Sequence, residues 1–262
     1  MLSTQRFSFC ALTVCLFLAA CEQKQPAAAP PVYDEAQLRA FVLSTPTLTE
    51  KVVADSLQHI LVKASPDSVV FRRTLLFLTE PFSSPNSSYR SQPMYATLLT
   101  ATMQSKWYNS EEKANAQVKL TLSQQNLVGH AANDFSYTSP DGQVKRMYGV
   151  KANFLLLYFN NPECEACKEM KAALTQSAVI NQKIQTGELK VLSIYADADK
   201  KIWKAHLGEC PTKWLQGIGE SGTSYKKIYD LSAIPTMYLL DKDKQVLLKD
   251  YFPVQDIERL VK

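Results

Sequence analysis

Phe154-Leu155-Leu156-Leu157-Tyr158-Phe159 is a continuous apolar run, and Cys164-Glu165-Ala166-Cys167 follows it after a short polar stretch. An unbroken apolar run of this kind is typical of a strand that is buried on both faces. Two cysteines separated by two residues can close a small ring at the start of a helix, where unpaired backbone N–H groups and the helix dipole stabilise a thiolate. A thiolate beside a second thiol is the minimum requirement for thiol–disulfide exchange.

Strand and helix patterns alternate around this stretch. Ser139-Pro140-Asp141-Gly142 separates two short strand patterns and predicts a hairpin. The further predicted elements are a helix over residues 168–185, a strand over 191–195, a helix over 201–207, strands over 236–240 and 245–248, and a helix over 255–262. Strand, helix, strand, helix, hairpin and helix form an α/β order with parallel and antiparallel strands in one sheet.

The segment from about residue 33 to 126 has a different pattern. Its apolar residues recur at helical spacing, and prolines separate one group from the next. This pattern predicts about five short helices. The segment contains no combination of residues that is typical of a catalytic site.

The N-terminus has the features of a processing signal. Arg6 precedes an apolar run over residues 7–20, which is too short for a membrane-spanning helix of roughly 20 apolar residues. The run ends in Leu18-Ala19-Ala20-Cys21, which resembles the lipobox of bacterial lipoproteins and implies cleavage before Cys21 and a lipid on it. The alternative is an ordinary signal peptide that happens to contain a cysteine. Residues 22–31, polar and then rich in Ala and Pro, are typical of a tether.

The composition of the chain argues against some classes of function. The chain has 262 residues, of which 46% are hydrophobic, and this suits one or two globular domains. A net charge of +4, without a basic run that includes aromatic residues, argues against nucleic acid as a partner. After processing, the cysteines besides the lipid-bearing one are Cys164, Cys167 and Cys210. A disulfide-stapled scaffold would carry several pairs, so this pattern favours a redox role.

From about residue 131 onward the chain resembles the thioredoxin-like superfamily, in particular the membrane-anchored thiol–disulfide oxidoreductases of the TlpA type. Three features carry the resemblance: the strand leading into the cysteine pair, Ala233-Ile234-Pro235-Thr236 before a later strand, and Ala132-Asn133-Asp134-Phe135 at the opening of the hairpin. It implies an α/β thioredoxin fold, a mixed sheet flanked by helices, with Pro235 in the cis form and facing the cysteines. The helical segment resembles a domain of unknown function that precedes thioredoxin-like domains in some bacterial lipoproteins.

These observations predict four segments in the chain. They are a lipoprotein signal peptide over 1–20, a tether over 21–32, a small all-α domain over 33–128 and a thioredoxin-like domain over 129–262.

The resemblance also implies the site. Cys164 is the attacking thiolate and Cys167 resolves the mixed disulfide, so that the two form a Cys164–Cys167 disulfide. Pro235 shapes the substrate groove, and the backbone around Ile234 can pair with an extended substrate segment.

Two positions depart from the family pattern. Glu163 stands where relatives usually have Trp before the first cysteine, and Tyr158 stands where thioredoxins have a buried Asp. An ordinary phenol has a pKa of about 10 and is a poor base at neutral pH. Glu165 is therefore a candidate for proton transfer, because some reductases of this type have Glu in that position. The alternative is a solvated acid at a helix start, which the helix dipole favours.

The cysteines have three alternative roles to compare with thiol–disulfide exchange. Zinc could be held by Cys164 and Cys167 with His206 and Cys210, but Pro235 in the thioredoxin position argues against it. A permanent disulfide would close a short loop and stabilise little. Haem attachment is excluded because Lys168, not His, follows the second cysteine. The expectation is therefore no metal and no cofactor, with Cys210 a bystander thiol and His206 a helix-end residue.

The sequence thus predicts a lipid-anchored thiol–disulfide oxidoreductase of the bacterial cell envelope, facing the periplasm. Its expected partners are extracytoplasmic proteins with disulfides or thiols, an upstream thiol protein that donates electrons, and the membrane through Cys21. An anionic Glu165 disfavours the thiolate, which favours the reducing direction. The alternatives are a non-enzymatic lipoprotein that binds a partner and has an inert thioredoxin-fold scaffold, and a peroxide-reducing enzyme. Asn161 stands where peroxiredoxins have Thr, which argues against the latter.

Overall fold

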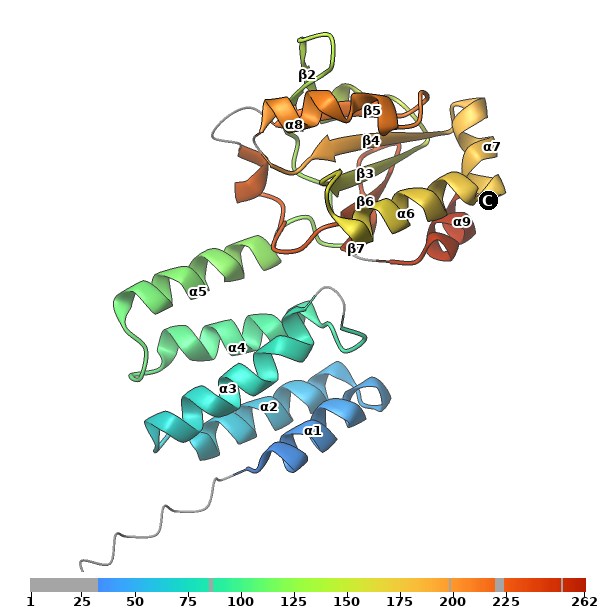
Figure 1. Ribbon diagram of the computed structural model, residues 1–262. Coiled ribbons are helices and arrows are strands. Elements are labelled where there is room, and N and C mark those ends of the chain that lie inside the picture. Colours follow the sequence, from blue (N-terminus) through green and yellow to red (C-terminus); the bar gives the residue numbers. More distant parts are fainter. Residues whose placement is uncertain (1–32, 85–86, 198, 220–223, 251) are drawn as a thin grey trace, which may run out of the picture. The chain divides into compact units, whose positions relative to one another are not determined.

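The computed structural model describes residues 33–84, 87–197, 199–219, 224–250 and 252–262 (Figure 1). The predicted signal peptide, the predicted tether and Cys21, the predicted site of lipid attachment, lie outside the described residues.

Five α-helices form the first part of the described chain, as predicted. They are α1 (Glu35–Ser44), α2 (Glu50–Ala64), α3 (Ser68–Ser83), α4 (Gln92–Gln104) and α5 (Ser110–Ser123). Polar side chains begin several of them, because the first N–H groups of a helix need acceptors. Asp34 and Asn109 each form a capping box with the residue three positions later. The apolar stripes of α1 to α4 meet in one core cluster.

The second part is built on a seven-stranded sheet with the order β2-β1-β5-β4-β3-β6-β7. The strands are β1 (Ser136–Thr138), β2 (Val144–Arg146), β3 (Phe154–Asn160), β4 (Leu189–Tyr195), β5 (Leu215–Gly219), β6 (Thr236–Asp241) and β7 (Val246–Asp250). β3, β4 and β5 are parallel, and the other neighbouring pairs are antiparallel. The mixed sheet and the preceding helices confirm the predicted fold class.

The central strand β3 explains why its sequence is apolar throughout. Leu155, Leu157 and Phe159 belong to a core cluster on one face of the sheet. Leu156 and Tyr158 belong to a second cluster on the other face, which also contains side chains of α6 (Glu165–Gln176), α7 (Ala178–Thr186) and α9 (Val254–Val261). These helices lie along the sheet in Figure 1. A strand buried on both faces needs apolar side chains at every position.

The predictions and the structure differ at three places. The helix predicted over 168–185 is two helices, α6 and α7, because Ser177 adopts an extended conformation and its hydroxyl accepts the Ile180 N–H. The strand β5 was not predicted. It is short and contains two glycines, which weaken a strand pattern. The helix predicted over 201–207 is α8 (Lys200–Ala205), followed by a 3₁₀ turn at Leu207–Glu209.

No helix within the described ranges combines the length and the apolar character that crossing a bilayer requires.

Gly217 allows β5 to pack between its neighbours, and we expect Gly217→Ala to destabilise the protein. A Cβ at this position would collide with the ring of Tyr137 and lie 3.0 Å from Ile194 Cδ1. Overpacking of this kind costs roughly 1–3 kcal/mol. Urea denaturation of the mature protein measures the effect. Gly149→Ala is the matched control, because a Cβ there meets nothing within 4 Å. Equal stability of the two variants would contradict the packing shown here.

Candidate active site

Cys164 lies at the junction between β3 and α6, where it is the N-cap residue of the helix. Its backbone is extended (φ −81°, ψ 119°), and its Sγ accepts the Cys167 N–H at 3.3 Å. Asn161 shapes the turn that precedes it. The Asn161 side chain accepts the Glu163 N–H at 2.8 Å, and its carbonyl accepts the Cys164 N–H at 3.1 Å. The turn therefore directs the first sulfur at the positive end of the helix, where a thiolate is stabilised.

The two sulfurs have different environments. Cys164 is half-buried, whereas Cys167 is only 2% exposed. Both are free thiols, and the Cys167 Sγ donates to the Cys164 Sγ at 2.7 Å. Burial and the hydrogen bond with Cys164 together raise the pKa of Cys167 to about 12, although a hydrogen bond with the Asn161 backbone opposes them. The exposed sulfur can meet a partner and the buried one cannot. The predicted disulfide between them remains a prediction.

Ile234 and Pro235 lie beside the first cysteine. The Cys164 Sγ is 3.7 Å from the Ile234 carbonyl oxygen, and the Ile234–Pro235 peptide bond is cis, as the resemblance implies. These residues meet because β3 pairs with β6, with Phe159 opposite Thr236. β6 begins directly after Pro235. Its pairing with β3 therefore brings Ile234 and Pro235, the two residues before β6, to the end of β3.

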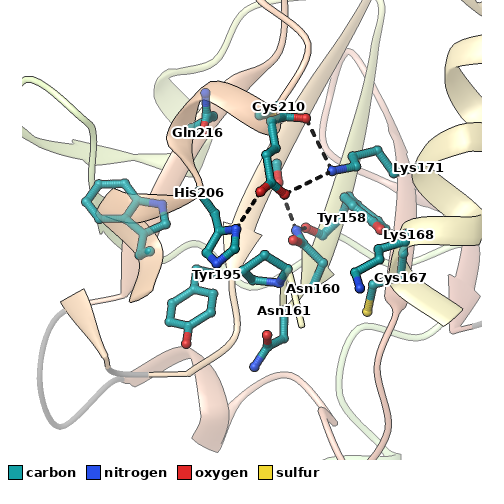
Figure 2. A pocket seen from close by; sticks show the side chains of 14 residues that line it. Tyr158, Asn160, Asn161, Cys167, Lys168, Lys171, Tyr195, His206, Cys210 and Gln216 are labelled. Atoms are coloured by element: carbon teal, nitrogen blue, oxygen red, sulfur yellow. Dashed lines mark hydrogen bonds and ion pairs between the residues drawn. The ribbon is translucent and has the colours of Figure 1, made fainter. Parts of the chain in front are cut away.

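A small cavity lies behind Cys167 (Figure 2), with room of about 40 Å³ for water. Several polar side chains that line the cavity contact one another. His206 Nδ1 is 2.7 Å from Glu209 Oε1, and Lys171 donates to the Glu209 carbonyl at 3.2 Å. The second Glu209 oxygen is 3.9 Å from Lys171 Nζ. Sequence reasoning took His206 for a helix-end residue, and the structure does place it as the C-cap of α8. The contact with Glu209 was missed, although the His-x-x-Glu spacing could have indicated it.

Cys210 also lines this cavity. It is half-buried, and burial raises its pKa to about 11, while a hydrogen bond with Ser193 and the charge of Lys171 act in the other direction. In the part of the chain that the structure describes, no three His, Cys, Asp or Glu side chains are grouped so that they could hold a metal ion.

Comparison with solved structures gives the family. A thioredoxin-like protein from Bacteroides caccae is 34% identical, covers 86% of this chain and 82% of its own, and superposes with a TM-score of 0.77. The chain belongs to the thioredoxin-like family.

Other similar structures cover less of the chain. The C-terminal domain of an uncharacterized protein from Bacteroides fragilis is 42% identical over 52% of this chain and 97% of its own, with a TM-score of 0.49. The thioredoxin domain of a thiol-disulfide oxidoreductase from Bacteroides vulgatus is 18% identical over 52% of this chain and 99% of its own, with a TM-score of 0.46. No protein-family model matches the sequence, and no curated protein matches it.

Tyr158 has the position of the buried Asp of other thioredoxin-like proteins, but its role here is different. Its hydroxyl donates to the Cys167 carbonyl at 2.5 Å, and its ring packs edge-on against Trp214 at 5.9 Å. The side chain is 1% exposed, and burial, together with the nearby sulfurs, raises the pKa of its phenol far above the usual value. Tyr158 therefore holds the first turn of α6 and does not accept a proton.

Glu165 and Glu163 are exposed on the surface of this thioredoxin-like site. The Glu165 side chain is 76% exposed, and its carboxylate is 3.2 Å from Lys168 Nζ. This geometry fits a solvated acid at a helix start. Proton transfer by Glu165 remains a prediction.

The asymmetry of the thiols predicts their order of alkylation. In the reduced protein at pH 8, iodoacetamide should modify Cys164 at least about tenfold faster than Cys167 and Cys210, because burial raises the pKa of both of those thiols and the thiolate is the reactive form. The rate at Cys167, whose pKa is raised to about 12, should continue to rise with pH well above pH 9. Peptide mass spectrometry over time measures all three rates, with Cys164→Ser as the control for the slow sites. Equal rates at Cys164 and Cys167 would contradict the environments described above.

Tyr158→Phe tests the assignment of Tyr158 as a structural residue. Loss of its hydrogen bond should lower the free energy of unfolding by about 1 kcal/mol. The pH dependence of thiol exchange should stay the same, because the phenol does not take part in it. Tyr148→Phe, which removes a hydroxyl bonded to the Ala132 carbonyl at 2.6 Å, is the control for loss of a comparable bond. A changed pH profile in Tyr158→Phe alone would show that the phenol takes part.

Proposed function

We propose that this chain is a thiol–disulfide oxidoreductase that reduces or exchanges disulfides of extracytoplasmic proteins through Cys164 and Cys167. One observation carries the proposal: the half-exposed Cys164 sulfur accepts an N–H at the start of α6, while its partner sulfur, 2.7 Å away, is buried. An attacking thiol has to be accessible and able to ionise, and a resolving thiol has to be close and protected.

The reaction has two exchange steps. The Cys164 thiolate attacks one sulfur of a substrate disulfide, and the other substrate sulfur leaves as a thiolate that takes up a proton. Cys167, deprotonated, then attacks the Cys164 sulfur of the mixed disulfide. The Cys164–Cys167 disulfide forms, and the second substrate thiol leaves. The substrate gains two electrons and two protons, and the protein loses them, so an upstream thiol protein has to reduce the pair again.

The substrate segment is proposed to lie along Ile234 and Pro235. The Ile234 carbonyl is 3.7 Å from the attacking sulfur. An extended chain bonded through its own sulfur to Cys164 could therefore pair with this backbone by strand addition.

The direction of transfer is proposed to be reducing. Glu163 and Glu165 flank the first cysteine and disfavour its thiolate, although Glu165 is also 3.2 Å from Lys168 Nζ. A less stable thiolate makes the reduced form of the pair less stable and the pair a better reductant.

The proposed location of the protein in the cell rests on the N-terminal sequence. Leu18-Ala19-Ala20-Cys21 supports lipid attachment at Cys21 and a position in the bacterial cell envelope, facing the periplasm. The proposal requires no cofactor or metal, since sulfur chemistry alone supplies both steps.

Trapping of mixed disulfides tests the function. Cys167→Ala should retain substrate proteins from the envelope fraction on Cys164, and these adducts should dissolve with dithiothreitol. Cys164→Ser should retain none. Cys210→Ser, which leaves the pair intact, is the matched control and should cycle between dithiol and disulfide in glutathione buffers as the wild type does. A wild-type pair that does not cycle, together with no trapped partners, would overturn the proposal and favour the scaffold alternative.

A further inference from the structure

We infer that His206, oriented by Glu209, accepts the proton of Cys167 when that thiol resolves the mixed disulfide. This inference rests on the proposed function and adds a proton acceptor to it. It concerns the second exchange step only, and it uses the polar cavity behind Cys167, to which the proposed function gives no role (Figure 2).

The step needs a base because Cys167 is a buried thiol. Only the thiolate attacks a disulfide, and the Cys167 side chain is 2% exposed. Tyr158 cannot serve, since its hydroxyl keeps its proton and donates a hydrogen bond to the Cys167 carbonyl at 2.5 Å. Glu165 points to solvent and pairs with Lys168. The acceptor has to be found among the other groups that line the cavity.

The titratable side chains that share the cavity with Cys167 can be compared one by one. They are Tyr158, Lys168, Lys171, Tyr195, His206, Glu209 and Cys210. The two lysines are cations at neutral pH and have no lone pair to offer. The pKa values of Tyr195 and Cys210 are raised by burial, so both groups keep their own protons.

Glu209 and His206 remain as candidate proton acceptors, and the hydrogen bond between them gives each a different role. The hydrogen bond from His206 lowers the pKa of the Glu209 carboxyl, which makes it a weak base. The carboxylate can only accept, so the neutral ring presents its Nδ1–H to Glu209 at 2.7 Å. Its Nε2 is then the nitrogen with a lone pair. This is the arrangement in which a carboxylate fixes the tautomer of a histidine base.

Cys167 and His206 both line the cavity, so the inferred transfer runs through water in it. Its room of about 40 Å³ exceeds the roughly 10–15 Å³ that one water molecule needs, and polar groups line it. The proton leaves the Cys167 Sγ, passes through water in the cavity and arrives at Nε2. The thiolate forms a bond with the Cys164 sulfur, the bond from Cys164 to the substrate breaks, and the leaving substrate thiolate is protonated at the expense of the imidazolium.

Charged groups from two elements surround the ring. Glu209, on the 3₁₀ turn, is hydrogen-bonded to the ring, and the positive charges of Lys168 and Lys171, on α6, also act on the Glu209 carboxyl and lower its pKa. Tyr195, on β4, lines the same cavity. Burial raises the pKa of its phenol, so the side chain is neutral at pH 7.

Two-phase kinetics with an aromatic disulfide test the inference. The reduced protein is mixed with 5,5′-dithiobis(2-nitrobenzoate). The first nitrothiobenzoate released reports the attack by Cys164, and the second reports resolution by Cys167. In His206→Gln the second phase should slow by at least about tenfold at pH 7, and its rise between pH 5 and 8 should be lost, because a positioned base contributes about 10²–10⁴-fold. The first phase should stay within about twofold of the wild type.

Three further variants sharpen the result. His59→Gln alters an exposed histidine of α2 and is the matched control, which should leave both phases unchanged. Glu209→Gln should slow the second phase less than His206→Gln, since the ring loses its orienting carboxylate but keeps its nitrogen. Added imidazole should restore the second phase in His206→Ala, because the His206 side chain is 33% exposed and its place can be reached.

Two outcomes would overturn the inference. One is a second phase in His206→Gln with the wild-type rate and pH dependence. The other is equal slowing of both phases without rescue by imidazole, which indicates a structural role. Failure of the proposed function has a different signature: the wild type itself would release no second equivalent, or would release it equally in Cys167→Ala.

Discussion

The site depends on one hydrogen bond at the start of α6, in which the Cys167 N–H donates to the Cys164 sulfur. It makes the first cysteine the N-cap of a helix and places the second one turn later, inside the core. A single helix start thus produces two sulfurs of opposite character, one open to partners and one desolvated. The buried strand β3 and the Asn161 turn fix where that helix begins.

The sheet makes the second contribution. Because β6 runs antiparallel beside β3, the residues just before it meet the end of β3, although 70 residues separate Cys164 from Ile234. The substrate groove is therefore a consequence of strand pairing in the core. Mutations that loosen this pairing should affect redox chemistry without any contact with sulfur.

Local patterns in the sequence predicted much of this arrangement. The apolar run of β3, the helical spacing over the first part of the chain and the hairpin turn each depend on residues close in sequence. The break at Ser177 and the strand β5 were missed because a single cap and a glycine-containing strand leave weak periodic signals. The contact of Glu209 with Lys171 joins two separate elements, and no local pattern could place both at the cavity behind Cys167.

The replacement of an acid by Tyr158 links the fold to the chemistry. A carboxylate at that position can take up a proton, whereas the buried phenol keeps its own proton and donates a hydrogen bond to the helix that carries the cysteines. The position thereby gains a structural role and loses a chemical one. Since a buried thiol still has to ionise for exchange, the base has to come from another element. Polar groups of α6 and of the turn after α8 line the small cavity that Cys167 also lines. A chain that moves its base in this way can keep a drier core under the cysteine pair, because no charge then has to be buried beneath it.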